Sequence, residues 1–190
     1  MDNKDHQHLN NYTAYLSGPI EAMQDHGVVW REDFKRLIEQ NNLPLSVIDP
    51  CDKGKDNEEQ FEIGASREYM QSLRREGKFE ELRSIMKKIR RWDLRAVDYS
   101  NILIASVDKK IPTWGTVDEC VVAERQKKPV FVISPEGAYS CPDWMFAIAS
   151  VDEIFSSVSE CINHLKLIND GTVSMDRRWV NIEKKNFFTE

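Results

Sequence analysis

A carboxylate at the start of a predicted helix is the feature of this chain that most directly suggests catalysis. Residues 114–119 read Trp-Gly-Thr-Val-Asp-Glu and follow the apolar run 102–105, which has the composition of a buried strand. The Gly115-Thr116 pair predicts a turn that opens a helix, with Glu119 in its first turn. Free backbone N–H groups and the helix dipole favour an ionised carboxylate there, so Glu119 could act as a nucleophile or a base. A purely structural glutamate that complements the dipole is the open alternative.

A second carboxylate, Asp93, lies on the apolar face of another predicted helix. That face carries Leu82, Ile85, Met86, Ile89, Trp92 and Ala96 at helical spacing. Asp93 follows Ile89 by four residues and therefore shares the face. Burial of a bare carboxylate is costly, so we expect Asp93 to be hydrogen-bonded, paired or functional. A salt bridge to an arginine of the same helix is the structural alternative, and Asp98 is predicted to belong to the turn that follows.

Two hydroxyl groups and a glycine stand at the end of the first strand-like run. Tyr15 and Ser17 precede Gly18-Pro19, which stops the run. The bare backbone of Gly18 can approach a ligand closely. A Ser-Gly-Pro sequence by itself is more often only a turn, so this motif gains meaning only beside the two carboxylates.

Alternating strands and helices would position these residues. Strands are predicted at residues 12–17, 45–48, 102–107 and 129–133, and residues 173–182 suggest a further edge strand. Helices are predicted at residues 28–40, from about 64 to 97 with a break at Gly77, at 116–126 and at 154–168. This alternation predicts an α/β fold with a parallel sheet between helices. Ligands of such sheets bind beyond the carboxyl ends of the strands.

Composition narrows the class of protein. The chain has 190 residues, of which 41% are hydrophobic, and a net charge of −6, which argues against a polymeric nucleic acid as partner. No run of apolar residues is long enough to span a membrane, and the first residues are polar, so we expect a cytoplasmic protein without a signal peptide. The four cysteines include no CxxC pair, which favours reduced thiols. We expect neither a metal nor a cofactor.

The domain organisation is predicted to be simple. Residues 1–11 are expected to form a disordered tail, and residues 12–190 a single domain. A polar, charged connection from Cys51 to about Gly64 opens a longer insertion at about 51–92, which we interpret as a lid.

Three motifs occur in a fixed order along the chain. They are Tyr15-Leu16-Ser17-Gly18-Pro19, Asp93 before the strand that ends in Ile104-Ala105, and Gly115-Thr116-x-x-Glu119-x-x-x-Ala123 before Lys128-Pro129-Val130. Together they resemble the nucleoside 2-deoxyribosyltransferase family and its relatives that hydrolyse the N-glycosidic bond of nucleotides. The resemblance spans roughly residues 14–148, although residues 51–91 are longer and more basic than is usual. It implies a flavodoxin-like, Rossmann-type three-layer α/β/α fold with a mostly parallel sheet of about five strands.

The resemblance also implies roles for the three motifs. Glu119 would be the nucleophile, Tyr15 the hydroxyl that orients it, and Asp93 the acid and base that serves the leaving nucleobase. Glycosidic cleavage can use two carboxyl groups in this way, one as the nucleophile and the other as the acid and base. The acceptor of the sugar would then be either a second base, which gives transfer, or water, which gives hydrolysis. The sequence is compatible with both. Such sites are completed by a neighbouring subunit, so a homodimer or larger homo-oligomer is expected.

Two positions depart from the pattern of the transferases. In the transferases, the residue six positions before the nucleophile is an aspartate that binds the sugar, whereas this chain has Thr113 at that position. The relatives that act on 5′-monophosphates carry a serine at that place, so Thr113 favours a nucleotide. Asp143 and Met145 lie in a segment that resembles the one reaching the neighbour's site. An aspartate there would repel a phosphate unless an arginine intervenes, so Asp143 favours a free nucleoside.

The remaining candidates are predicted to contact the substrate. Beside Thr113, Asp143 and Met145, they are Ser17, Gly18, Pro19, Asp49, Trp114, Gly115 and Thr116. Trp30, Trp114 and Trp144 could each stack on a base or belong to the core. Arginines of segment 74–91 are additional candidates for phosphate contacts. The predicted activity is deoxyribosyl transfer from a 2′-deoxynucleoside or its 5′-monophosphate. A 5′-monophosphate N-glycoside hydrolase and a non-catalytic nucleotide sensor are the alternatives.

Overall fold

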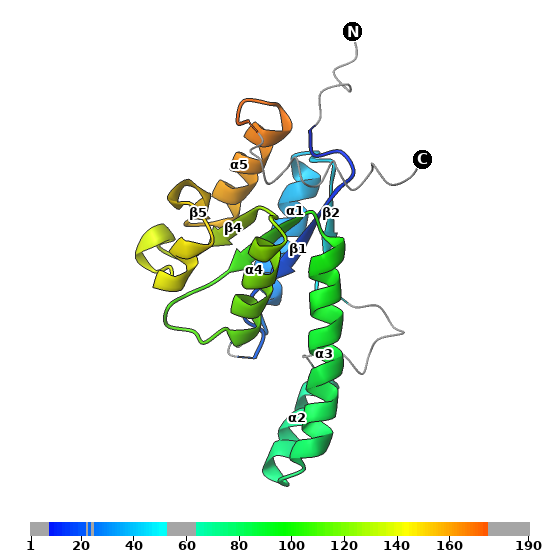
Figure 1. Ribbon diagram of the computed structural model, residues 1–190. Coiled ribbons are helices and arrows are strands. Elements are labelled where there is room, and N and C mark those ends of the chain that lie inside the picture. The colour runs from blue at the N-terminus through cyan, green and yellow to red at the C-terminus, as the bar shows by residue number, and fades with distance from the viewer. Residues whose placement is uncertain (1–7, 22, 24, 53–63, 175–190) are drawn as a thin grey trace.

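The fold is a parallel sheet between two layers of helices (Figure 1). The computed structural model describes residues 8–21, 23, 25–52 and 64–174. Within them, five strands pair in parallel in the order β2-β1-β3-β4-β5. They are β1 (Tyr12–Ser17), β2 (Leu45–Ile48), β3 (Ile102–Ser106), β4 (Val130–Ile133) and β5 (Ile154–Phe155). This is the flavodoxin-like strand order, which confirms the predicted fold class.

Helices cover both faces of the sheet. α1 (Val28–Gln40) and α5 (Val158–Asn169) pack together on one face, and α3 (Phe79–Tyr99) and α4 (Trp114–Arg125) on the other. α2 (Gly64–Arg75) packs against α3, and this hairpin extends beyond the sheet (Figure 1). Gly77, with φ of 71°, separates the two helices as predicted, because a left-handed residue ends a helix most easily when it is glycine.

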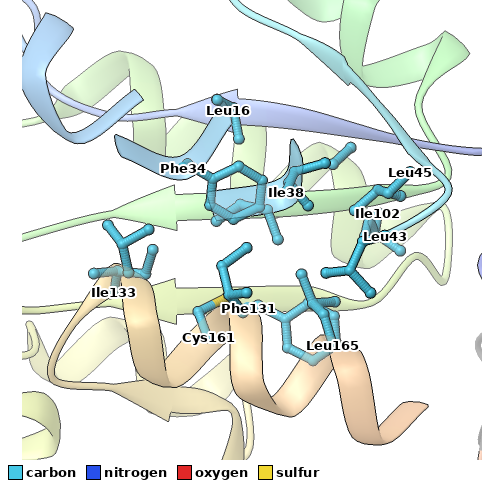
Figure 2. Close-up of a cluster of buried hydrophobic side chains, with 14 of the residues drawn as sticks. Leu16, Phe34, Ile38, Leu43, Leu45, Ile102, Phe131, Ile133, Cys161 and Leu165 are labelled. Carbon is cyan, nitrogen blue, oxygen red and sulfur yellow. The ribbon is translucent and has the colours of Figure 1, made fainter. Parts of the chain in front are cut away.

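Successive side chains of each strand point to opposite faces of the sheet, and they contribute to two separate hydrophobic cores. In β1, Ala14 and Leu16 face α1 and α5, whereas Tyr15 faces α3 and α4. β3 repeats the pattern, with Ile104 on the first side and Leu103 on the second. Figure 2 shows the first core, where side chains of the sheet meet those of α1 and α5. The parallel strands are therefore largely apolar on both faces, and the buried hydroxyl groups of Tyr15 and Ser17 in β1 stand out among them.

The start of α4 differs from the prediction. The helix begins at Trp114, because the N–H of Val117 already donates to the carbonyl of Thr113 at 3.0 Å. Gly115 is an exposed helical residue with open space around it rather than part of a turn. Glu119 is consequently not in the first turn, and the prediction that free helix N–H groups stabilise its charge is wrong. Its stabilisation comes from side chains instead.

The C-terminal elements also differ. The predicted helix at 154–168 is wrong at its beginning, where Ile154 and Phe155 pair with β4 as the fifth strand. Ser157 then caps α5, its hydroxyl accepting from the N–H of Glu160 at 3.2 Å. Val173 is not in a strand, and the rest of the edge strand predicted at 173–182 lies outside the described residues from 175 onward.

The described part of the range predicted to be a tail, residues 8–11, contains one buried residue. Residues 8–11 form a turn in which Leu9 is fully buried, and its N–H donates to Asn169 Oδ1 at 3.1 Å. Residues 1–7 of the predicted tail and residues 53–63 lie outside the described chain, whereas residues 64–92 of the predicted insertion belong to α2 and α3. The function of this insertion as a lid remains a prediction. No described helix combines the length and the apolar character that crossing a membrane would require.

Candidate active site

A cavity of about 420 Å³ opens beyond the carboxyl ends of β1 and β3. The strand order reverses between these two strands, which is where flavodoxin-like folds bind their ligands. β1 and the loop after it contribute Tyr15, Gly18 and Pro19. α3 contributes Asp93, and the segment from Thr113 into α4 contributes Trp114, Gly115, Thr116 and Glu119. The fold thus brings most of the predicted site residues to one place.

Two hydroxyl groups hold the carboxylate of Glu119. The Tyr15 hydroxyl donates to Glu119 Oε1 at 2.9 Å, and the Ser17 hydroxyl donates to Oε2. Tyr15 and Ser17 share one face of β1 because successive strand residues alternate. One donor on each oxygen suits an ionised carboxylate, which can only accept. Glu119, 8% exposed, is therefore a fixed and oriented nucleophile candidate.

The pKa of Tyr15 lies well above its ordinary value. Burial of the phenol is the largest cause, followed by the negative charges of Glu119 and Asp93 and by the hydrogen bond to Glu119. Both carboxylates therefore act on the same phenol, which stays protonated and donates to Glu119 throughout the neutral range.

Tyr15→Phe is expected to make the free energy of unfolding less dependent on pH in the alkaline range. The phenol of the unfolded chain has its ordinary pKa of 10.0, whereas burial raises the pKa of the folded phenol, which keeps its proton to higher pH. The wild type should therefore lose free energy of unfolding as the pH rises through 10.0, and the variant should lose less. Urea unfolding of both proteins from about pH 8 to about pH 11 measures this difference. Parallel curves would contradict the raised pKa.

Asp93 reaches the cavity from α3 and is 7% exposed. Ile89, one turn earlier, is buried and lines the same cavity. The predicted apolar face of this helix continues beyond the sheet, where Met86 is 41% exposed. Asp93 thus lies where the helix passes from the buried core to the open hairpin, which gives a buried carboxylate access to a ligand.

The rim of the cavity is aromatic and polar. Trp114 is 86% exposed beside the opening, a position from which it can stack on a planar ligand. Thr113 precedes α4, and its side chain makes no capping hydrogen bond to that helix. Arg90 of α3 also lines the cavity and donates through Nε to Asp118 of α4 at 2.9 Å.

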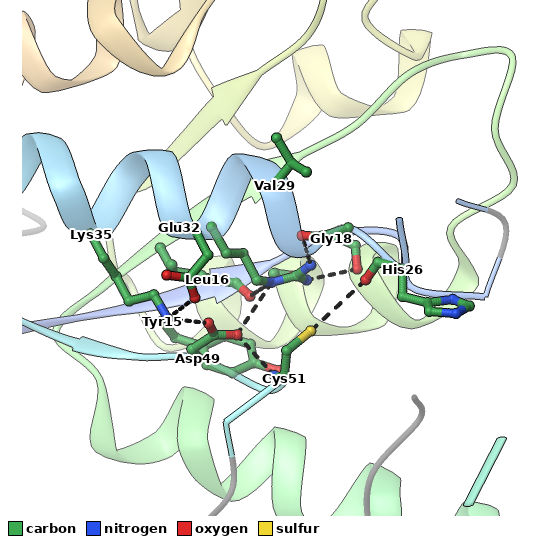
Figure 3. Close-up of polar contacts among 12 residues, drawn as sticks. Tyr15, Leu16, Gly18, His26, Val29, Glu32, Lys35, Asp49 and Cys51 are labelled. Atoms are coloured by element: carbon green, nitrogen blue, oxygen red, sulfur yellow. Dashed lines mark hydrogen bonds and ion pairs between the residues drawn. The ribbon is translucent and has the colours of Figure 1, made fainter. Parts of the chain in front are cut away.

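Four predicted contact residues do not line this cavity. Asp49 is buried and forms ion pairs with Arg31 and Lys35, with the closest nitrogens at 3.6 Å and 3.0 Å (Figure 3). Met145 is fully buried in the core beneath α4, and Asp143 is exposed near it. Their contacts with a substrate remain predictions. Ser17 is not part of the cavity wall and meets the site through Glu119.

Arg31 is the structural residue that the sequence analysis missed. It is fully buried and donates to the carbonyls of Leu16, Gly18 and Gly27 at 3.3, 3.0 and 2.7 Å (Figure 3). It thereby fixes both ends of the loop that follows β1 and lines the cavity. Its spacing of three residues before Phe34 placed it on the buried face of α1, and this was the signal in the sequence.

Arg31→Met is expected to destabilise the chain by about 3 kcal/mol, because it leaves three carbonyls and Asp49 with fewer partners. Arg36→Met on the same helix removes an exposed ion pair with Asp33 and should cost less than about 1 kcal/mol. Urea denaturation of the two variants compares them directly. Equal losses would show that the buried contacts of Arg31 add nothing.

The fold and the cavity define a flavodoxin-like α/β protein with two carboxylates at the point where the strand order reverses. No group of described residues has the composition and spacing of a metal site. No protein-family model and no curated protein matches the chain. Among solved structures, it is similar to a 2-deoxyribosyltransferase from the psychrotolerant bacterium Bacillus psychrosaccharolyticus, with 18% identity and a TM-score of 0.38. The match covers 65% of this chain and 72% of that one, and at this level it bears on neither reaction nor substrate.

Proposed function

We propose that the protein cleaves the N-glycosidic bond of a 2′-deoxynucleoside or its 5′-monophosphate and transfers the sugar to a second base. The observation that carries the proposal is the buried Glu119 carboxylate, held on both oxygens by Tyr15 and Ser17, with Asp93 in the same cavity. A fixed carboxylate can attack an anomeric carbon, and a second carboxyl group can protonate the leaving base.

In the first step, an oxygen of Glu119 bonds to C1′ of the sugar. The C1′–N bond breaks, its electron pair stays on the base nitrogen, and the acid form of Asp93 supplies the proton that neutralises it. Tyr15 keeps its hydrogen bond to the other oxygen of Glu119 and so aligns the attacking lone pair.

In the second step, the nitrogen of an incoming base attacks C1′ and the Glu119 ester bond breaks. Asp93 takes the proton from that nitrogen, so both carboxyl groups return to their starting forms. Two inversions give net retention of configuration. If water enters in place of the base, the same intermediate yields free sugar, and the protein is a hydrolase.

The site also supports a planar substrate with polar sugar groups. Trp114 offers an exposed aromatic face at the rim, and Thr113 offers a hydroxyl at the start of α4. The cavity volume of about 420 Å³ lies within the range of small-ligand sites.

Base exchange is the direct test. The protein is incubated with a deoxynucleoside or its 5′-monophosphate, with and without a second free base, and each base is quantified by chromatography. Exchange that needs the second base supports transfer, and release without it supports hydrolysis. Binding without any release, unchanged in Glu119→Ala, would contradict catalysis and favour a nucleotide sensor.

We further propose that the protein acts as a homo-oligomer in which the segment around Asp143 meets a neighbour. Tyr139, Trp144 and Phe146 in this region are 85%, 66% and 42% exposed, and exposed apolar groups of this size are typical of interfaces. Light scattering coupled to size-exclusion chromatography gives the mass in solution. A monomer at working concentration would contradict the proposal.

A further inference from the structure

A second cavity, of about 360 Å³, adjoins the candidate active site. Glu21 and Met86 line both cavities, so the two spaces meet at these side chains. Its walls come from α2, from the exposed half of α3 and from the loop after β1. A ligand that fills the first cavity could therefore extend into the second without leaving the protein surface.

The second cavity is basic, although the whole chain is acidic. Arg67, Arg74 and Arg75 of α2 line it together with one carboxylate, Glu21. Arg67 donates to the Glu21 carbonyl at 2.6 Å, and the Arg74 guanidinium lies 4.0 Å from the Glu21 carboxylate. Three guanidinium groups around one carboxylate leave an excess of positive charge in a chain whose net charge is −6.

The arginine side chains that line the second cavity indicate an anionic ligand. Guanidinium groups bind phosphates through paired N–H donors. The phosphate of a 5′-monophosphate is attached directly to the sugar and so stays in the cavity that holds the sugar. A group that reaches the adjoining cavity must lie further along the chain of phosphates.

We propose that the second cavity binds the terminal phosphates of a nucleoside di- or triphosphate whose base and sugar occupy the first cavity. The assignment of base and sugar rests on the proposed function. The binding of a polyphosphate to the arginines does not, because it follows from the lining of the second cavity alone.

Inorganic pyrophosphate tests the cavity separately from catalysis. Isothermal titration of the full chain should show binding, and the double variant Arg74→Gln/Arg75→Gln should weaken it at least about tenfold. Both side chains are exposed, and Arg67 is kept because it anchors the loop after β1. The control, Arg83→Gln, removes one exposed arginine of α3 that pairs with Glu80 and lines neither cavity. Equal weakening in the control, or no binding by the wild type, would overturn the proposal.

Substrate preference tests the connection between the two cavities. Base release is measured for one deoxynucleoside and for its mono-, di- and triphosphate. The ratio of kcat/KM for the triphosphate to that for the nucleoside should fall at least about tenfold in the double variant and change less than about twofold in Arg83→Gln. Base release with no gain from added phosphates would overturn the inference and leave the proposed function intact. If pyrophosphate binds and its binding requires the two arginines, but no substrate releases its base, the proposed function is overturned and the phosphate site is retained.

Discussion

Glu119→Gln is expected to lower kcat for base release by about 10⁴-fold or more, because an amide cannot form the glycosyl bond. The substitution keeps the size of the side chain but changes its hydrogen bonding. Tyr15 and Ser17 each donate to a glutamate oxygen, so one of them would face the amide NH₂ group and lose its acceptor. Steady-state kinetics with the preferred deoxynucleoside measures the loss, and thermal unfolding verifies that the variant is folded.

The matched control is Glu124→Gln on the same helix. Glu124 is 42% exposed and its ion pair, with Lys127 at 3.5 Å, is on the surface. Its kcat should stay within about twofold of the wild type, because surface pairs contribute little. A folded Glu119→Gln protein with more than about a tenth of the wild-type kcat would exclude Glu119 as the nucleophile.

Asp93→Asn is expected to lower kcat by about 10²- to 10⁴-fold, the usual contribution of a general acid. The loss should depend on the leaving group, because an asparagine cannot protonate the departing base. A base that is cationic in the nucleoside, as in 7-methyl-2′-deoxyguanosine, takes the electron pair of the C1′–N bond and leaves as a neutral molecule without that proton. With 7-methyl-2′-deoxyguanosine, the variant should therefore recover most of the wild-type rate of base release.

Asp98→Asn on the same helix is the control for Asp93. Asp98 lies in the last turn of α3 and not in the turn predicted to follow it, and it is exposed and accepts from Gln126 Nε2 at 2.6 Å, outside the cavity. Its replacement should change kcat less than about twofold for both substrates. If Asp93→Asn loses the same factor with both leaving groups, Asp93 is a positioning residue and not the acid.

The fold could be predicted because local patterns agreed with the global arrangement. The apolar runs that became β1, β3 and β4 alternate with helical segments, and this combination allows few arrangements other than a parallel sheet. The inward position of Asp93 followed from its spacing to Ile89 alone, and the structure buries both residues. Periodicity is reliable where a whole element is buried on one side.

Other features depend on contacts between distant residues, which periodicity does not contain. Asp49 directly follows β2 and forms ion pairs with Arg31 and Lys35 of α1, and spacing along the chain did not indicate these partners. β5 consists of only two residues, and they form a strand because they pair with β4. The second cavity arises from the packing of α2 beside the loop after β1, where the contacting residues Glu21 and Arg67 are 46 positions apart in the chain.

The interleaving of roles along β1 has a consequence for how the sequence can change. Tyr15 and Ser17 hold Glu119 on one face, and Leu16 between them is fully buried in the opposite core. Leu16 serves the fold alone, whereas Tyr15 is fully buried in the second core and also donates to Glu119, so selection for turnover and selection for folding act on Tyr15 together. Laboratory evolution of new substrate ranges is therefore better directed at the exposed rim residue Trp114 than at these positions of β1.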